Sequence, residues 1–301
     1  MDDEVYEKYR RAGKIAAEAR DYGAGLIKTG VSFLNVADSV ESKIAENGAD
    51  VAFPVNISVN KIAAHYTPRH DDKLVFKKGD VVKLDVGAHV DGFIADTAVT
   101  VEVGSNEYED MIKASSDALD AAIDMMKPGV NLGDVGKKIE ETINSYGYKS
   151  VENLTGHSLE CYNLHSGISV PNVSTKLGGM KPKDGNVLAV EPFATNGRGH
   201  VVSDKGSNIY LCAKSFRSRF VRENRSKIMF KKIKAEFKTL PFSQRGCKKI
   251  FPNNVDIILR RLSFLGVIKH YPQLVEQNHG IVTQKEHTVI VKDGGCEVTT
   301  I

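Results

Sequence analysis

Helical and strand-like hydrophobic patterns alternate along the chain. Apolar residues recur at helical spacing over roughly residues 3–27 and 107–126, as in EDMIKASSDALDAAIDMM. Strand-like runs follow, and they read VVKLDVGAHV, FIADTAVTVEV, NVLAVEPFAT and HTVIVKD. The Asp91-Gly92 pair between the first two runs indicates a hairpin and antiparallel pairing. The pattern therefore predicts an α+β fold.

Two segments separated by a constant offset of 99 residues are similar to each other. Residues 28–48 read KTGVSFLNVADSVESKIAENG, and residues 127–147 read KPGVNLGDVGKKIEETINSYG. Each contains a turn, an amphipathic helical pattern and a final glycine, with Asn35 and Asp134 as the expected N-caps. Two halves related by a pseudo-twofold axis would explain the repeat, whereas two similar helices arising by chance are the simpler alternative.

The segment 201–270 has a different composition from the rest of the chain. It contains 17 Lys and Arg against 4 Asp and Glu, a net charge of +13, whereas the other residues carry 24 basic and 34 acidic groups, a net charge of −10. Residues 216–240 have a helical pattern, Pro241 and a turn follow, and residues 253–271 have a second helical pattern. Because a strand pattern resumes afterwards, we expect an inserted unit of two helices and a short extended piece.

The composition of the 301-residue chain is that of an ordinary globular protein. Hydrophobic residues make up 41% and charged residues 26%, unlike a disordered chain. The cysteines have no C-x-x-C spacing, which argues against a structural zinc site and a disulfide framework. The start MDDEVYEKYRR lacks the apolar core of a secretory signal, and no apolar run reaches the roughly 18 residues of a membrane span. We therefore expect a cytoplasmic protein without a membrane partner.

The stretch LDVGAHVDGFIAD places two carboxylates in adjacent strand patterns. One loop position would set Asp85 directly opposite Asp96, and a loop at Asp91-Gly92 would set Asp85 opposite Ala98 with Asp96 as its diagonal neighbour. Both registers leave the two carboxylates on one face, because side chains alternate with a period of two. The two charges repel, and a divalent cation between them is one solution. The alternative is that Asp85 caps a turn and Asp96 is solvated.

Three further residues extend this acidic pair. His157 in NLTGHSLE lies in a loop after a helical pattern, Glu191 in AVEPFAT ends an apolar run, and Glu286 in QKEHTVIV begins the last strand pattern. Alone, each has an ordinary structural explanation, since a histidine beside glycine is usually structural and a glutamate at a strand end is usually exposed. With Asp85 and Asp96 they provide two Asp, two Glu and one His, a set suited to a two-metal hydrolytic centre.

These motifs together resemble those of the type II methionine aminopeptidases. The resemblance extends from about residue 3 to the end of the chain, in the order FPVNISVNKIAAHYTP, KLDVGAHVDGFIADTAVT, NLTGHSLECYNLHSG, LAVEPFA and TQKEHTVIV. It includes FKTLPFSQR and LSFLGVIKHYPQL, which are similar to the helical insertion that separates type II from type I. The chain resembles the short, archaeal-like form of these enzymes, which belong to the M24, or pita-bread, metallopeptidases.

The resemblance implies a fold and a metal centre. The fold is the pita-bread fold of two related halves with a curved antiparallel sheet, formed by residues 1–200 and 271–301 and interrupted by a winged-helix-like insertion at 201–270. The cofactors are two divalent ions, and cobalt, manganese, iron and zinc all suit such a site. The implied ligands are Asp85 for one metal, Asp96 and Glu286 as bridges, and His157 and Glu191 for the second metal.

The resemblance also implies an activity. The enzyme would remove the N-terminal methionine from nascent proteins and peptides whose second residue is small, by attack of a water that bridges the metals. Glu191 would carry the proton, His65 would contact the scissile amide nitrogen, and His165 would stabilise the oxyanion. Phe53 and Tyr271 would form walls of the pocket for the methionine side chain.

Two alternatives remain within the same scaffold. The first is a prolidase or X-Pro aminopeptidase, which has a similar ligand set; the AAHYTP motif and the insertion argue against it. The second is a non-catalytic relative that associates with RNA or ribosomes; the five intact ligand positions argue against it. The implied state is a monomer, and the basic insertion is a candidate contact with the ribosome, although a solvated helical face is the simpler explanation. Ile209 stands where eukaryotic relatives carry a histidine, so the pocket would differ there in detail.

Overall fold

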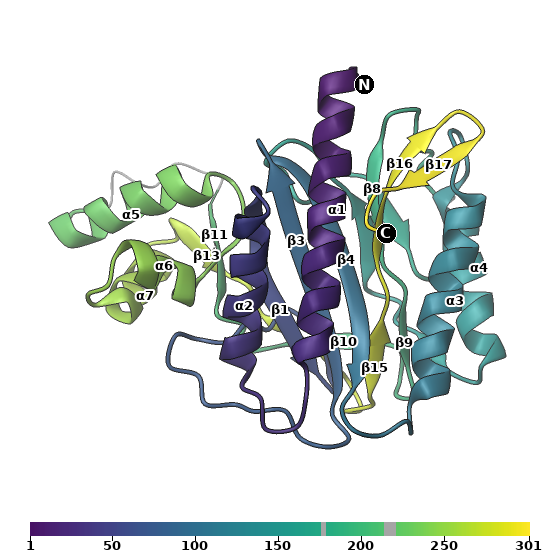
Figure 1. Ribbon diagram of the computed structural model, residues 1–301, viewed down its shortest axis with the longest axis horizontal. Coiled ribbons are helices and arrows are strands. Elements are labelled where there is room, and N and C mark those ends of the chain that lie inside the picture. The colour runs from purple at the N-terminus through teal and green to yellow at the C-terminus, as the bar shows by residue number, and fades with distance from the viewer. Residues whose placement is uncertain (176–178, 214–220) are drawn as a thin grey trace.

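The first half of the chain forms a pair of helices packed on an antiparallel sheet (Figure 1). The computed structural model describes residues 1–175, 179–213 and 221–301. The elements of this half are α1 (Asp3–Leu26), α2 (Phe33–Glu46), β1 (Asp50–Val59), β2 (Ile62–Ala64), β3 (Val81–Val90) and β4 (Phe93–Glu102). The sheet has the order β1-β3-β4, and α1 covers β3 and β4 while α2 covers β1. Alternating buried side chains hold the helices on the sheet, as the hydrophobic pattern predicts.

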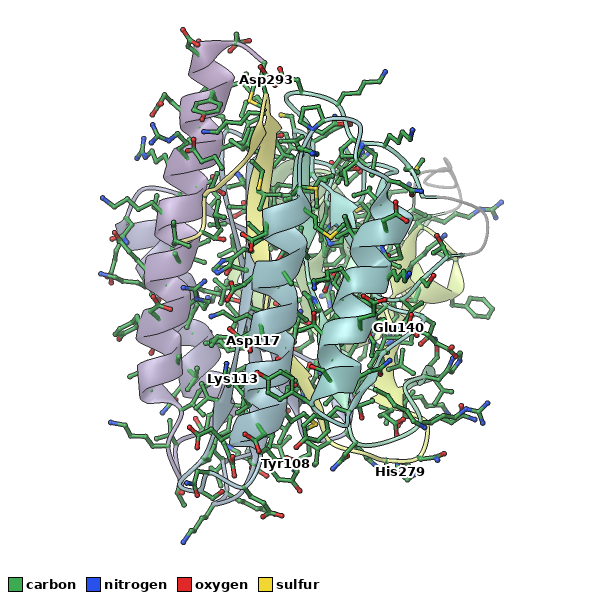
Figure 2. All side chains as sticks on the ribbon, turned by 90° about the vertical axis from the view of Figure 1, so that its right-hand side faces the viewer. Tyr108, Lys113, Asp117, Glu140, His279 and Asp293 are labelled. Carbon is green, nitrogen blue, oxygen red and sulfur yellow. The ribbon has the colours of Figure 1, made fainter. Side chains whose placement is uncertain are left out.

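The second half repeats this plan with shorter strands. Its elements are α3 (Glu109–Met125), α4 (Leu132–Ser145), β5 (Lys149–Ser150), β6 (Thr155–Ser158), β7 (Ser169–Pro171), β8 (Val187–Val190), β9 (Phe193–Thr195), β15 (Val282–Gln284), β16 (His287–Lys292) and β17 (Gly295–Val298). The strands form two antiparallel sheets, β17-β16-β8-β6-β7 and β15-β9-β5. Figure 2 shows α3 and α4 side by side. Lys113 and Asp117 on α3 form an ion pair at 2.7 Å.

The repeat with an offset of 99 residues coincides with these helix pairs. Helices α2 and α4 begin and end 99 residues apart, and the same offset separates their N-caps, Ser32 and Asn131. The predicted N-caps Asn35 and Asp134 are wrong, because both lie within the first turn of their helices. The Ser32 hydroxyl accepts the N–H of Asn35 at 3.1 Å, and Asn131 accepts the N–H of Gly133 at 2.9 Å. The predicted α+β class is confirmed, and the two helix pairs agree with the pita-bread arrangement.

Residues 201–276 supply the remaining elements, three of which are helices. They are β10 (Val201–Asp204), β11 (Ile209–Cys212), α5 (Asn224–Phe237), β12 (Phe242–Ser243), α6 (Gln244–Ile250), α7 (Val255–Phe264), β13 (Ile268–His270) and β14 (Gln273–Glu276). The helices enclose their own hydrophobic core, which includes Met229, Ile233, Leu259 and Leu262. Figure 1 shows α5, α6 and α7 at the opposite end of the molecule from α3 and α4.

The prediction for the basic segment was wrong in two respects. Residues 268–270, at the end of the second predicted helix, form β13, and the segment contains a third helix. The turn expected after Pro241 contains α6, whose first turn is capped by the Ser243 hydroxyl accepting the N–H of Gly246 at 2.8 Å. Of the predicted helix 216–240, residues 216–220 lie outside the described part of the chain, and the described helix begins at Asn224. The boundaries at 201 and 270 stay a prediction. Across the described residues, no helix combines the length and apolar character needed to cross a membrane.

Candidate metal centre

The β3–β4 hairpin positions the first two carboxylates. Asp91 and Gly92 form its two-residue loop, and both have a left-handed φ, of 52° and 91°, as a tight hairpin turn requires. Asp85 lies opposite Ala98, so the second of the two predicted registers is the correct one. Asp96 is therefore the diagonal neighbour of Asp85 on the same face of the sheet.

Glu286 lies beside Asp96 because its backbone pairs with β4. The N–H of Ala98 donates to the Glu286 carbonyl at 3.3 Å, and the Glu286 N–H donates to the Ala98 carbonyl at 3.1 Å. The Thr288 hydroxyl accepts the Asp96 N–H and donates to the Asp96 carbonyl, both at 2.8 Å. The Thr97 hydroxyl donates to the Glu286 carbonyl at 2.8 Å. Glu286 precedes β16, which is the penultimate strand and not the last one as predicted.

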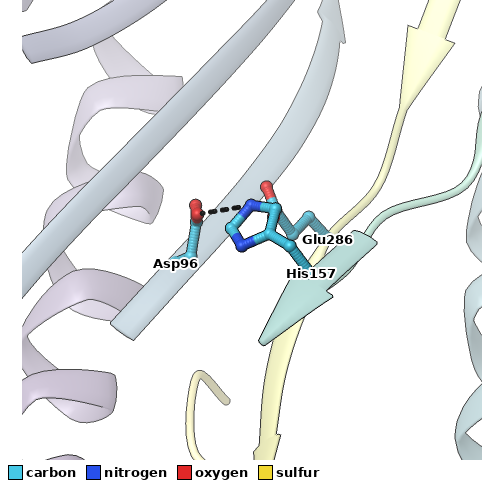
Figure 3. Close-up of side chains that lie close together, drawn as sticks. All are labelled: Asp96, His157 and Glu286. Atoms are coloured by element: carbon cyan, nitrogen blue, oxygen red, sulfur yellow. Dashed lines mark ion pairs between the residues drawn. The ribbon is translucent and has the colours of Figure 1, made fainter. Parts of the chain in front are cut away.

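His157 and Glu191 come from adjacent strands of the second half. His157 lies on β6, and Glu191 directly follows β8. The loop predicted for His157 is therefore wrong, because its backbone pairs with both β7 and β8. Its Nε2 atom lies 3.7 Å from Asp96 Oδ2 and 3.8 Å from Glu191 Oε1. Figure 3 marks the first of these pairs with a dashed line. Asp96, His157 and Glu286 each offer a ligand atom, and these atoms lie within 4.8 Å of one another.

All nine residues that the sequence predicts for the site line a single cleft. Its volume is about 530 Å³ when the open space at its mouth is included. The His65 ring packs edge-on against Tyr271 with centroids 5.3 Å apart, and His165 packs against His157 at 4.3 Å. Besides these nine, the lining residues are Asn56, Ala64, Leu164, Ile209 and Pro241.

The four carboxylates in this cleft resist ionisation when no cation is near. Burial raises the pKa of Asp85 to about 7. Burial and the neighbouring carboxylates raise the pKa values of Asp96, Glu191 and Glu286 well above the ordinary values. Four negative charges in one buried cleft are unfavourable unless positive charge meets them. The site is therefore electrostatically incomplete without a cation.

The buried histidines are neutral. Burial, and then the nearby His165, lower the pKa of His157 to about 3 and that of His65 to about 4. His165 is exposed at the mouth of the cleft, and loss of part of its hydration still lowers its pKa. A neutral imidazole is the form that binds a metal or donates a single N–H.

Gln284 is a site residue that the sequence prediction missed. Its buried Nε2 donates to Glu191 Oε2 at 3.2 Å and to Glu286 Oε2 at 3.4 Å. It thereby orients two carboxylates from different elements. The signal was present in TQKEH, because residues two apart on a strand share a face, and Gln284 is two residues before Glu286.

The donor set fits a divalent metal. Among the described residues, the Oδ1 atoms of Asp85 and Asp96 are buried and accept no hydrogen bond from the protein. Carboxylate oxygens with one neutral imidazole are the ligands that manganese, cobalt, iron and zinc accept in hydrolytic sites. Buried oxygens without donors, three converging ligand atoms and excess negative charge all favour a cation in this position.

Comparison with known proteins identifies relatives over the whole chain. Residues 7–238 match the family described as metallopeptidase family M24. Proteins named methionine aminopeptidase from Archaeoglobus fulgidus and Methanocaldococcus jannaschii are each 46% identical to the chain over 300 residues, and 100% of both proteins is covered in each case.

Solved structures share the fold at lower sequence identity. The methionine aminopeptidase from Rickettsia prowazekii has a TM-score of 0.73 at 22% identity, covering 100% of this chain and 98% of that one. A thermophilic Arx1 has a TM-score of 0.86 at 15% identity, covering 99% and 91%. The prolidase from Pyrococcus furiosus has a TM-score of 0.63 at 19% identity, covering 100% and 64%. At these identities the similarity shows the fold alone.

Proposed function

Because the chain belongs to metallopeptidase family M24, we infer that it is a metal-dependent aminopeptidase that removes the N-terminal methionine from peptides. The full-length relatives at 46% identity, which are named methionine aminopeptidase, support this activity over that of a prolidase. The single observation that carries the inference is the convergence of Asp96, His157 and Glu286 in one cleft with Asp85 and Glu191.

The cleft is proposed to hold two divalent ions. Four ionised carboxylates would balance the four positive charges of the pair, which offsets the cost of burying them. When bound, the ions would lower the pKa of a water molecule and polarise the scissile carbonyl. Cobalt, manganese, iron and zinc remain candidates, since such ligand sets accept each of them. The proposed ligands are Asp85 for one ion, Asp96 and Glu286 for both, and His157 and Glu191 for the other.

Glu191 is the proposed proton carrier. Its Oε1 lies 3.8 Å from His157 Nε2, and its Oε2 accepts a hydrogen bond from the Gln284 amide. These two contacts fix the orientation of the carboxylate within the cleft. It would take a proton from the attacking water and pass it to the leaving amine. His165 at the mouth would donate to the developing oxyanion, and the neutral His65 would meet the scissile amide nitrogen.

The apolar side of the cleft is the proposed pocket for the methionine side chain. Phe53 and Ile209 are buried there, with Tyr271, Leu164 and Pro241 beside them. An unbranched thioether needs apolar contacts and no polar partner, which is what this lining offers. Hydrolysis is proposed to favour peptides whose second residue is small.

A pair of peptides tests the proposed activity. Protein stripped with a chelator and reconstituted with each ion in turn is expected to release methionine from a Met-Ala peptide and to leave an Ala-Pro peptide intact. Hydrolysis of the Ala-Pro peptide alone would assign the cleft to the prolidase type instead. Calorimetric titration with manganese tests the number of ions, because one site per chain would contradict the proposed pair.

A contact with ribosomal RNA is a second proposal, supported by charge. Segment 201–270 has a net charge of +13, and Lys231 and Lys232 are exposed on α5 at one end of the molecule (Figure 1). Basic surfaces bind phosphate backbones in a salt-dependent way. Reversing the charge of Lys231, Lys232 and Lys234 is expected to reduce co-sedimentation with ribosomes, and unchanged co-sedimentation would contradict the contact.

The resemblance to type II enzymes also supports a monomer located in the cytoplasm. Light scattering would test the oligomeric state, and cell fractionation would test the location.

A further inference from the structure

Strand β1 is irregular where it borders the cleft. Its pairing with β3 changes register between Val51 and Phe53, and again between Phe53 and Asn56. Phe53 and Asn56 both line the cleft, and Val55 between them has no ladder partner among the described residues. A bulge beside a site redirects side chains, but it leaves backbone N–H and C=O groups without a partner in the sheet, and other residues must supply their hydrogen bonds.

Side chains from two other segments form hydrogen bonds with the backbone carbonyl and N–H of Val55. The Thr67 hydroxyl donates to the Val55 carbonyl at 2.7 Å, and Glu41 Oε1 accepts the Val55 N–H at 3.4 Å. Glu41 lies on α2, and the fully buried Thr67 lies two residues after His65. The bulge and the segment that carries His65 are therefore tied together.

Arg245 on α6 contacts both of these side chains. Its Nη1 donates to the Thr67 hydroxyl at 3.0 Å and to the Pro68 carbonyl at 2.7 Å. Its Nη2 pairs with Glu41, and its Nε lies 3.2 Å from Asp38 Oδ1. Arg245 is only 2% exposed, and its planar group suits several acceptors at once. One side chain of segment 201–270 thus joins α2 to the residues after β2.

The same segment holds the residues after His65 from another side. The Thr67 N–H donates to the Ser207 carbonyl at 3.1 Å, and the Asn208 amide donates to the Thr67 carbonyl at 2.8 Å. His65 has a left-handed φ of 65°, and its ring packs on Tyr271. A residue other than glycine keeps that conformation only where its surroundings hold it. Contacts from segment 201–270 therefore fix the backbone two residues after His65.

We propose that Arg245 is a positioning residue for the substrate side of the cleft. By binding Glu41 and Thr67 together, it holds the β1 bulge that presents Phe53 and the segment that presents His65. This inference rests on the proposed function, which assigns Phe53 and His65 to the substrate. The described partners of Arg245 include none of the proposed metal ligands, so its effect falls on the peptide and not on the ions.

The variant Arg245→Met removes the polar group and keeps much of the apolar packing. We expect kcat/KM for a Met-Ala peptide to fall about tenfold, because small displacements of positioning groups have large kinetic effects. The Kd for manganese and the absorption spectrum of the cobalt-loaded protein are expected to stay unchanged. Lys249→Gln is the matched control: Lys249 lies 3.8 Å from Asp38 and 3.7 Å from Glu41, but it is 59% exposed and its described contacts do not include Thr67. Its kcat/KM should not change.

A second variant separates positioning from folding. Arg245→Met removes the buried cationic partner of Glu41 and leaves it with the exposed Lys249 at 3.7 Å, which destabilises a largely buried carboxylate. The double variant Arg245→Met with Glu41→Gln removes that charge, keeps an acceptor for Val55, and is expected to fold with the same kinetic defect. A folded variant with normal kcat/KM would overturn the inference, as would a defect proportional to lost manganese binding. Wild-type protein that binds manganese but leaves Met-Ala intact would refute the proposed function instead.

Discussion

The two sides of the cleft are built by different means. On the acidic side, Asp85 and Asp96 sit on strands paired in register, and Glu286 is bridged directly to β4. On the substrate side, Phe53 follows a bulge and His65 has a left-handed backbone, and side chains from distant segments hold both. Strand ladders position groups more rigidly than loops do. We therefore expect changes on the acidic side to alter metal binding or chemistry, and changes on the substrate side to alter how the peptide is bound and positioned while metal binding stays the same.

The largest effect is expected for Glu191→Gln. The amide keeps the shape and can still donate an oxygen to a metal, but it cannot accept the proton of the attacking water. We expect kcat to fall by roughly 10²–10⁴-fold with the metal content retained. Single-turnover kinetics and elemental analysis of the same sample measure both quantities. Near-normal turnover in a fully metal-loaded variant would remove Glu191 from the proposed chemistry.

Gln284→Leu tests whether the acidic side needs its supporting amide. The variant loses the donors to Glu191 and Glu286, so the two carboxylates lose their fixed orientation. We expect metal affinity to weaken by about 10–100-fold, as is usual when such supporting groups are removed. The KM for the peptide should recover once the metal is saturating. Unchanged metal affinity by titration calorimetry would show that the strands alone suffice.

Phe53→Ala tests the substrate side by itself. The Phe53 ring lies over Gly87 of β3, where a Cβ atom would come within 2.2 Å of it, so its place in the cleft is closely defined. Loss of the ring removes apolar contact with the methionine side chain, and we expect KM to rise about tenfold. Metal affinity should match that of the wild type. A parallel loss of metal affinity would mean that the two sides are coupled more closely than their construction suggests.

The smallest effect concerns stability and pH. Burial raises the pKa of Asp85 to about 7, so from about pH 4 to 7 the folded chain keeps a proton that the unfolded chain releases. Stability of the metal-free protein should therefore fall as pH rises through this range, by a few degrees in Tm between pH 5.5 and 8. Bound manganese should remove the decrease, because it favours the ionised carboxylates. A metal-free protein with a higher Tm at pH 8 would contradict this account.

Local patterns predicted the hairpin that carries the two aspartates of the acidic side. The alternation in VVKLDVGAHV and the Asp91-Gly92 turn predicted β3, β4 and the shared face of their aspartates. Only the loop position was undecided, and the turn conformation selects the register in which Asp85 faces Ala98. Glu191 directly follows β8, at the end of the apolar run as predicted.

Interactions between distant residues were not predictable in this way. The hydrogen bond from Gln284 to Glu191 depends on packing that brings together two residues 93 positions apart in the sequence. Helix α6 has only seven residues, and its cap at Ser243 follows a proline that suggested a turn. The hydroxyl of Ser32 competes successfully with Asn35 for the cap of α2, although both residue types favour that position. The Arg245 contacts join α6 to α2 and to the segment after β2, and they have no periodic signature.

The pairing of β10 with β14 has a consequence for how this architecture can be inherited. Asp204 lies opposite Gln273 in that ladder, so residues 205–272 leave the sheet and return to it at one point. One insertion or deletion in the gene could add or remove such a segment, because a short turn would join the two strands and leave the sheet intact. A descendant without it would retain all five acidic and imidazole positions, but it would need a new side chain in place of Arg245 to hold the bulge in β1.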